Sequence, residues 1–545
     1  MKTAYCLTSY FCVMKKFSRV FTAQPHLLRG EIISVEISIS RGLHAFHIVG
    51  MAGKSVDEAR SRVGAALHNC EYPSPKHINQ KTVVALAPAD LHKNGSRYDL
   101  AIAIGYLVAD GTLRPESNIL EKSLFLGELG LDGYLKPING SLALVQRAKE
   151  SGFTHVYVPQ QNAREAACIE GITIYPCNHL VQVCKHLDPE HTCPADHDFG
   201  SLAAIEAYTI PPDEQMGDEA SSNTNNLPCF SHVRGQAGAK RGLMIAAAGR
   251  HNVALYGPPG TGKSMLAQAF TGILPPLSQD EMLEVTRIHS IAGIFTGELS
   301  KTAPLRSPHH TASYVSIIGG GTYPQPGEIT LAHHGVLFLD EFPEFENRVI
   351  ESLRQPLEDK KIHISRASAS AEFPADCIVV AALNPCPCGF YGTKVKPCSC
   401  SPYQLERYQK RLSGPIVDRI DMWLPVEHID YEHFHIPLDS ENTTDTSLDI
   451  QKKVTQARTH QYTRNGEGKS NSHLKANDLT HMELAEEVRD LLIKSARALD
   501  LSPRSYHRVI KLARTIADIE GEKEILGDHV LESLQYRPKI SYGTH

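Results

Sequence analysis

Alternating apolar and polar residues predict a first folded region near the start of the chain. Period-2 and period-3.6 patterns predict, in order, the strand Ile32–Ile39, the helices Val56–His68 and Gly140–Ser151, and a strand near His155–Val158. Strands mixed with helices in this way indicate one α/β domain, which we place at residues 30–187 after an N-terminal extension of residues 1–29.

The periodic spacing of apolar residues is lost between residues 188 and 228. Pro, Asp, Glu, Ser, Asn and Thr dominate this stretch, which ends in a run of Ser, Asn and Thr. Such a composition cannot bury enough apolar surface to offset the entropy of ordering the chain. We therefore expect a flexible linker here.

Short apolar runs return after the linker and predict a second domain, at residues 229–430. The runs Val253–Tyr256, Val336–Leu339 and Ile378–Leu383 are separated by helical patterns. Wholly apolar strands that alternate with helices are typical of a parallel sheet covered on both faces. We expect that architecture here.

The C-terminal part predicts a small helical domain at residues 478–545, after a polar connecting segment at 431–477. Leu484, Val488, Leu491, Leu492 and Leu499 recur at helical spacing. Ser502-Pro503 and Asp528 are typical helix starts and predict two more helices. A chain of 545 residues is also too long for a single hydrophobic core, so several domains are expected.

The charge and the cysteine content of the chain limit the kinds of ligand site and the cellular compartment that we expect. With a net charge of −6 there is no global basic field, so any site for a polyanion must be local. Four of the 13 cysteines crowd into residues 386–400, which favours a metal site in a reducing compartment, the cytoplasm, over a disulfide framework. We find neither a signal peptide nor a membrane-spanning run, and Met1 and Met14 are both candidate initiation residues.

The strongest motif is a phosphate-binding loop. It follows the predicted strand Val253–Tyr256, precedes a helical run, and matches G-x-x-x-x-G-K-S. Glycines there aim backbone N–H groups and a helix N-terminus at phosphates, while the lysine contacts the β- and γ-phosphates and the serine binds magnesium. The predicted ATP-binding residues are Gly257, Pro258, Pro259, Gly260, Thr261, Gly262, Lys263 and Ser264.

Two carboxylates and an amide complete the predicted site. Asp340 and Glu341 follow the strand Val336–Leu339 directly, where Asp340 can join Ser264 in holding Mg²⁺ and Glu341 can polarise the attacking water. Asn384 follows the strand Ile378–Leu383 and can hydrogen-bond that water or the γ-phosphate. Arg419 and Arg504 are candidates for neutralising charge as the γ-phosphate leaves, although most arginines are only solvated surface residues.

The cysteine cluster predicts a zinc site. Cys386, Cys388, Cys398 and Cys400 form two C-x-C pairs that could present four thiolates to one tetrahedral Zn²⁺. The alternative is a set of buried cysteines without a metal. Two close pairs flanked by Pro and Gly suit a loop better than a core, which favours zinc.

These motifs, with several longer stretches, resemble the magnesium-chelatase-like AAA+ family from about residue 30 onward. The matching stretches include residues 307–313, 319–329, 335–345, 353–358 and 384–389. The resemblance implies an ATP-promoted homo-hexamer in which Arg419 acts as an arginine finger toward a neighbour's ATP. It also implies that Arg504 is the sensor-2 arginine of a helical lid.

The same resemblance implies a DNA helicase that drives branch migration while incoming DNA recombines during natural transformation. Its partners would be single-stranded and branched DNA, with recombination proteins as further candidates. The segment 309–323 and the hairpin-like Lys360–Arg366 are expected to line the pore, where Lys360, Lys361 and Arg366 could track a phosphate backbone. An exposed basic hairpin in solvent is the equal alternative for any one of them.

The front domain resembles the proteolytic domain of Lon, of the ribosomal protein S5 domain 2-like fold. Arg97 and Leu142 stand where Lon carries its catalytic serine and lysine, and Ser96 is off by one position. We therefore expect a non-catalytic module that forms the ring or contacts DNA. Two alternatives to a DNA motor stay open, namely an ATP-dependent protease and a chelatase-like motor that remodels a protein partner.

Overall fold

The computed structural model describes the chain with several gaps. The described residues are 16–50, 53–75, 79–93, 95–191, 204–208, 228–295, 299, 301–321, 324–365, 370–393, 396–412, 414–428, 446–480, 482 and 484–538. The chain divides into two compact units, Met1–Gly217 with Thr286–Leu299, and Asp218–Val285 with Ser300–His545. Most of the predicted linker lies outside the described residues.

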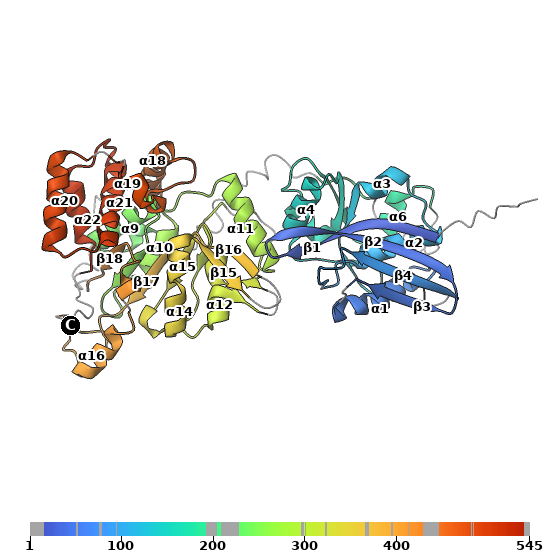
Figure 1. Ribbon diagram of the computed structural model, residues 1–545, viewed down its shortest axis with the longest axis horizontal. Helices are drawn as coiled ribbons and strands as arrows, with labels where there is room; N and C mark the ends of the chain where they lie inside the picture. The colour runs from blue at the N-terminus through green and yellow to red at the C-terminus, as the bar shows by residue number, and fades with distance from the viewer. Residues whose placement is uncertain are drawn as a thin grey trace, which may run out of the picture. The chain divides into compact units, whose positions relative to one another are not determined.

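The first unit is a seven-stranded mixed sheet in the order β3-β4-β2-β1-β5-β8-β9. Figure 1 shows β1 and β2 as its longest strands. The strands are β1 (Lys16–His26), β2 (Arg29–Arg41), β3 (Ala45–Val49), β4 (Gln80–Ala87), β5 (Ser123–Phe125), β8 (His155–Pro159) and β9 (Thr173–Cys177). A two-stranded sheet joins β6 (Glu128–Leu129) to β7 (Leu135–Lys136).

Helices pack on this sheet over a continuous core. On β2 the side chains of Ile33, Val35, Ile37 and Ile39 are buried, because alternate residues of a strand face the same side. The helix α2 contacts both β1 and β2, and α4 does the same. The helices are α1 (Lys54–Asn69), α2 (Asp99–Asp110), α3 (Ser117–Glu121), α4 (Ser141–Glu150), α5 (Ala163–Ala166) and α6 (Leu180–Leu187).

The first unit begins earlier than the predicted boundary at residue 30. The strand β1 lies within the predicted extension of residues 1–29, yet it pairs with β2 along its whole length, from Lys16 opposite Ile39 to His26 opposite Arg29. The backbone hydrogen bonds of a central strand cannot be removed without exposing the core beneath it. The boundary therefore moves to Lys16 or earlier.

The second unit has a five-stranded parallel sheet in the order β11-β14-β17-β10-β18. The strands are β11 (Leu305–Arg306), β14 (Val336–Leu339), β17 (Ile378–Leu383), β10 (Val253–Tyr256) and β18 (Met422–Pro425). The three predicted strands are confirmed with these bounds. Every residue of β14 and β17 is buried, as expected for strands covered on both faces.

Two small antiparallel pairs and several helices surround this sheet. The pairs are β12 (Gly319–Gly320) with β13 (Gln325–Pro326), and β15 (Lys361–Ser365) with β16 (Ser370–Pro374). The helices are α9 (Ala237–Gly249), α10 (Lys263–Thr271), α11 (Gln279–Ile291), α12 (Tyr314–Ile318), α13 (Glu328–Leu331), α14 (Asn347–Ser352), α15 (Arg354–Asp359), α16 (Pro402–Gln409) and α17 (Gly414–Val417).

The C-terminal helices of the second unit form the predicted small helical domain. They are α19 (Ala476–Thr480), α20 (Glu486–Ala498), α21 (Pro503–Glu520) and α22 (Gly527–Gln535). Ser502 caps α21 as predicted, accepting a hydrogen bond from the Ser505 N–H, whereas α22 begins one residue before Asp528. Val488, Leu492, Val509, Ala513 and Val530 belong to a core of this domain's own.

The predicted connecting segment contains a long helix, α18 (Ser447–Asn465). Its buried Ile450, Val454 and Ala457 join the core of the parallel-sheet domain, and α18 contacts α9 and α21. The polar composition that suggested a connector reflects the exposed face of this helix. No helix in the described ranges is long and apolar enough to cross a membrane.

A buried charge network ties α9 to the sheet. The Arg250 guanidinium lies 3.1 Å from the Asp376 carboxylate, and His473 lies 3.1 Å from the same carboxylate. Burial alone would raise the pKa of Asp376, but Arg250, His473 and Lys360 together hold it well below the usual range. The ionised carboxylate therefore stabilises the folded state.

We expect Asp376→Asn to lower the free energy of unfolding by about 3 kcal/mol, because it leaves Arg250 buried without its counter-ion. Since the native pKa is depressed, this stabilisation is complete above the ordinary aspartate pKa of about 3.9 and declines as pH falls below it. Urea unfolding at pH 7 and at acidic pH measures both effects. Glu372→Gln, which breaks an exposed ion pair with Lys361, is the control and should leave stability unchanged; equal losses in both variants would contradict the analysis.

Candidate nucleotide site

The phosphate-binding motif forms a tight turn between β10 and α10. Gly260 and Gly262 have φ of 78° and 87°, in the left-handed region that favours glycine. A Cβ at Gly257 would collide with the Val426 carbonyl oxygen, so only glycine fits where the loop passes the end of β18. The turn leads directly into the N-terminus of α10, the arrangement in which backbone N–H groups can bind phosphate.

Lys263 lies inside this turn. Its ammonium donates to the carbonyl oxygens of Gly257 and Pro258 at 2.8 and 2.7 Å, and to the Asn384 side-chain oxygen at 3.1 Å. Burial lowers the pKa of Lys263, and the nearby Asp340 carboxylate partly offsets that effect. These contacts pre-position the cation beside the place where the turn would hold the β- and γ-phosphates.

The predicted magnesium ligands lie together. The Ser264 hydroxyl donates to the Asp340 carboxylate at 2.9 Å, at the carboxyl end of β14. A hydroxyl and a carboxylate at this separation are the hard oxygen ligands that Mg²⁺ takes beside a triphosphate. The donor set therefore fits the predicted metal.

Glu341 adopts an uncommon backbone conformation next to Asp340. Its φ is 50°, which is rare for a residue with a Cβ, and its side chain is about half exposed. The His310 ring nitrogen lies 3.1 Å from its carboxylate. His310 stands in the stretch 307–313 that carried the family resemblance and in the segment expected to line the pore, but the sequence gave it no role beside Glu341.

Asn384 lies at the end of β17, between β10 and β14 in the sheet. Tyr256, the last residue of β10, pairs with Leu383, and Leu339, the last residue of β14, pairs with Ala381. This register brings Lys263, Asp340 and Asn384 to one edge of the sheet. The structure thus assembles the predicted nucleotide-binding set from three separate parts of the sequence.

Arg419 and Arg504 meet at a different point. Both contact one oxygen of Glu358, at 2.9 and 3.1 Å, and Arg419 also donates to the Pro415 carbonyl. Arg419 is 8% exposed, whereas the Arg504 side chain is 59% exposed. Glu358 lies in the stretch 353–358, but no sequence signal linked it to two arginines so far along the chain.

The four cysteines converge as predicted. The Cys386 sulfur lies 3.3 Å from that of Cys388 and 3.8 Å from that of Cys398, and the Cys388 and Cys398 sulfurs are 3.5 Å apart. The sulfur of Cys400 accepts a hydrogen bond from the Cys388 N–H. All four ligand atoms lie within 4.8 Å of one another, which suits a single tetrahedral metal ion.

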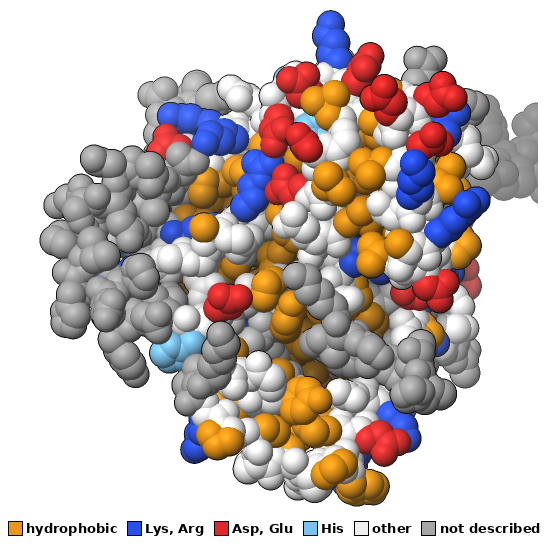
Figure 2. Space-filling model, turned by 90° about the vertical axis from the view of Figure 1, so that its left-hand side faces the viewer, with side chains coloured by type: hydrophobic (Ala, Val, Ile, Leu, Met, Phe, Trp, Pro, Cys, Tyr) orange, Lys and Arg blue, Asp and Glu red, His pale blue; other side chains and the backbone are white. Residues whose placement is uncertain are grey.

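The predicted DNA-contacting residues lie in and beside the β15–β16 hairpin. The Lys361 ammonium pairs with Glu372 at 2.6 Å and its side chain is 55% exposed, whereas Lys360 points to Asp376 and is 19% exposed. Arg366 lies outside the described residues, as do Thr322 and Tyr323 of the segment 309–323. Figure 2 shows acidic and basic side chains intermixed on the face that it presents. Contact with DNA stays a prediction.

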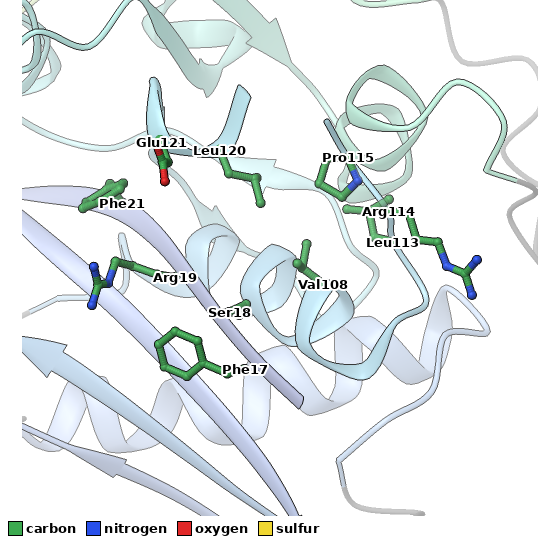
Figure 3. Close-up of a pocket in the computed structure, with 10 residues that line it drawn as sticks. All are labelled: Phe17, Ser18, Arg19, Phe21, Val108, Leu113, Arg114, Pro115, Leu120 and Glu121. Atoms are coloured by element: carbon green, nitrogen blue, oxygen red, sulfur yellow. The ribbon is translucent and has the colours of Figure 1, made fainter. Parts of the chain in front are cut away.

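The first unit contains no serine–lysine pair at the predicted positions. Leu142 is buried in α4, Arg97 has its pKa lowered by burial, and the Ser96 hydroxyl donates to Glu128. An open pocket of about 740 Å³ lies elsewhere on this unit (Figure 3). It is lined by Phe17, Ser18, Arg19, Phe21, Val108, Leu113, Arg114, Pro115, Leu120 and Glu121.

That pocket offers little catalytic chemistry. Its one hydroxyl nucleophile, Ser18, donates to the Gly105 carbonyl at 2.6 Å and is buried. The lining contains no histidine or cysteine. The described lining of this pocket therefore supplies no nucleophile–base pair.

Family profiles match residues in both units of the chain. Three family profiles match the chain: "Magnesium chelatase, subunit ChlI" over residues 229–434, "Subunit ChlI of Mg-chelatase" over 35–162, and "Magnesium chelatase, subunit ChlI C-terminal" over 444–537. A stretch of 152 residues is also similar to Lon protease 2 of Bacillus subtilis, at 30% identity over 26% of this chain and 27% of that protein.

Similarity to whole proteins extends over nearly the full length. The competence protein ComM of Haemophilus influenzae is 38% identical over 94% of this chain and 96% of its own length. The uncharacterised protein YifB of Escherichia coli is 38% identical over 93% of this chain and 94% of its own length. The chain therefore belongs to the magnesium-chelatase-like family of AAA+ ATPases.

Proposed function

We propose that the chain is the subunit of a hexameric, ATP-driven DNA helicase that promotes branch migration while incoming DNA recombines in natural transformation. The observation that carries the ATPase part is the convergence of Lys263, the Ser264–Asp340 pair and Asn384 at one edge of the parallel sheet. The DNA part is supported by similarity over almost the whole chain to a protein named for competence.

Hydrolysis follows from the positions of these groups. The turn at residues 257–262 and the Lys263 ammonium would hold the phosphates, and Ser264 and Asp340 would hold Mg²⁺, which neutralises phosphate charge when bound. Glu341 would accept a proton from the attacking water, and Asn384 would orient that water. Since Lys263 already contacts Asn384, the phosphate-binding and water-orienting groups share one hydrogen-bonded frame.

The two arginines would act at the same phosphates from different subunits. Arg419 would reach the ATP of a neighbour, and Arg504 would close over the ATP of its own subunit from the helical lid. In the single chain both contact one carboxylate, Glu358, which balances only one of the two positive charges. On assembly with ATP, the triphosphate would replace the Glu358 carboxylate as the partner of these arginines and would carry more negative charge.

The remaining segments would transmit the motion to DNA. The segment 309–323 and the β15–β16 hairpin would line the pore, with Lys360, Lys361 and Arg366 as candidate phosphate contacts. His310 links this segment to Glu341, so DNA in the pore and water at the ATP have a direct structural connection. The first unit would serve as a non-catalytic module for ring formation or DNA contact.

A zinc ion is the further cofactor that we propose. The four sulfurs of Cys386, Cys388, Cys398 and Cys400 present the ligand set of a closed structural site. Such an ion would fix the loop that follows Asn384.

The proposal predicts that single-stranded or forked DNA stimulates ATP hydrolysis by the purified protein. It also predicts that the protein moves the branch point along branched DNA. Glu341→Gln removes the water-polarising carboxylate, so we expect kcat to fall about 100-fold or more while ATP still binds. Steady-state ATPase and strand-exchange assays measure these effects. Stimulation by casein or by a porphyrin-binding partner, with no response to DNA, would instead favour a protein-remodelling motor.

Arg419 acting in trans predicts complementation between two inactive variants. Arg419→Ala lacks the finger and Lys263→Ala lacks the nucleotide site, so a mixed ring contains some interfaces where an intact site meets an intact finger. We expect each variant alone to be inactive and mixtures to recover part of the wild-type ATPase rate. Arg504→Ala mixed with Lys263→Ala should recover nothing, because the lid arginine serves its own site; recovery there would contradict the assignment.

The zinc site predicts one equivalent of zinc per purified chain. Replacing the two cysteines of either C-x-C pair by serine should release the metal, because two thiolates cannot complete a tetrahedral site. Elemental analysis after gel filtration measures the stoichiometry. Replacing the buried Cys377 and Cys184, which lie outside the cluster, is the control and should retain the metal.

A further inference from the structure

The cysteine loop touches the phosphate-binding turn. Gly389, the residue after Cys388, has φ of 85°, and a Cβ at this position would lie 2.5 Å from Cδ and 3.0 Å from Cγ of Pro259. Its backbone therefore packs directly against the pyrrolidine ring. Pro259 is part of the turn whose N–H groups would hold the phosphates, so the cysteine loop packs directly against that turn.

Both ends of the cysteine loop are tied to Asn384. Cys386 follows Asn384 by two residues, and its buried sulfur accepts the Tyr391 N–H. At the other end, α16 begins at Pro402, directly after Cys400 and its cap Ser401. The Tyr408 hydroxyl on α16 donates to the Asn384 carbonyl at 3.0 Å. A change in the loop thus acts on Asn384 from two sides.

Apart from the sulfurs, the described part of the loop is held by a few contacts, such as Lys396 over the Phe390 ring and Thr393 donating to the Phe390 carbonyl. Between Asn384 and Ser401 the described residues form turns and bends, with neither a strand nor a helix. The three measured sulfur separations, 3.3 to 3.8 Å, are close to the edge of about 3.8 Å expected for a tetrahedron with Zn–S bonds of about 2.3 Å. Without a metal, four thiols at these distances would contribute only weak hydrogen bonds.

We propose that a thiolate-bound metal ion at Cys386, Cys388, Cys398 and Cys400 keeps Gly389 seated on Pro259 and thereby sets the shape of the phosphate-binding turn. Loss of the metal releases Gly389, lets the turn relax, and weakens ATP binding. Metal occupancy is therefore a control on nucleotide affinity. This inference rests on the proposed zinc and nucleotide sites and adds the coupling between them.

Two glycines of the same loop provide a matched test. Gly389→Ala and Gly392→Ala both place a Cβ at positive φ, 85° and 72°, but only the first meets Pro259, whereas nothing lies within 4 Å of the second. We expect Gly389→Ala to retain its zinc and to bind a fluorescent ATP analogue about tenfold more weakly, or about 1.4 kcal/mol. Gly392→Ala should retain both zinc and wild-type affinity.

A double variant separates the contact from general damage to the loop. Pro259→Ala removes the Cγ and Cδ atoms that a Cβ at Gly389 would meet, so Gly389→Ala with Pro259→Ala should bind the analogue more tightly than Gly389→Ala alone. A merely destabilised loop would show no such rescue. If Gly389→Ala does not fold, the metal titration below provides the test on the wild-type chain.

Stepwise removal of the metal from wild-type protein completes the experiment. The zinc is removed with a chelator strong enough to compete with the cysteine thiolates. Zinc content and the dissociation constant of the ATP analogue are measured on the same samples, and circular dichroism reports whether the protein stays folded. We expect the dissociation constant to rise as zinc is lost and to recover when Zn²⁺ is restored. Zinc-free, folded protein with unchanged affinity would overturn the coupling.

The same samples distinguish failure of the coupling from failure of its premises. Wild-type protein that contains no zinc as purified, and binds none when it is added, would overturn the proposed zinc site. Zinc-loaded protein that does not bind ATP would overturn the proposed nucleotide site. The coupling itself is contradicted only if the protein binds both zinc and ATP and its affinity for ATP does not change when the zinc is removed.

Discussion

The parallel register of β10, β17 and β14 decides where Lys263, Asp340 and Asn384 lie relative to one another. Because the three strands run in the same direction and pair residue by residue, their carboxyl ends reach the same edge of the sheet. The residues that follow each strand are then the phosphate turn, Asn384 and the Asp340–Glu341 pair. All of these strands are nearly or fully buried, so the hydrophobic core fixes the positions of the polar groups above it.

A second feature is that each functional charge already has a partner within the chain. Lys263 is held by two carbonyls of its own turn, Glu341 by His310, and Arg419 with Arg504 by Glu358. A buried or half-buried charge without a partner is costly, so these contacts stabilise the subunit. ATP, and a neighbouring subunit in the proposed ring, would have to compete for groups that these contacts already satisfy.

Sequence patterns could identify the residues that the fold brings together at this edge of the sheet because their signals are local. The strand Ile378–Leu383 and the turn at 257–262 each need only a short run of residues to be recognised. Glu358 could not be found in this way, since its partners Arg419 and Arg504 come from distant parts of the chain. Likewise, the basic residue Lys360 reads as a surface charge in sequence, while the fold turns it to Asp376. The first strand was missed because its pairing with β2, and not its own pattern, makes it part of the sheet.

The cysteine loop illustrates how a site without a core of its own can be made rigid. It leaves the sheet at Asn384, yet among its described residues only Cys386 and Gly389 are buried. Apolar packing cannot hold such a segment, and hydrogen bonds to solvent-accessible backbone add little. The proposed thiolate-bound metal would replace the missing core with a few strong bonds, and its binding free energy would become folding free energy of the loop. The close packing of Gly389 against Pro259 would then pass that rigidity to the phosphate turn, so that the loop would act as part of the proposed nucleotide site.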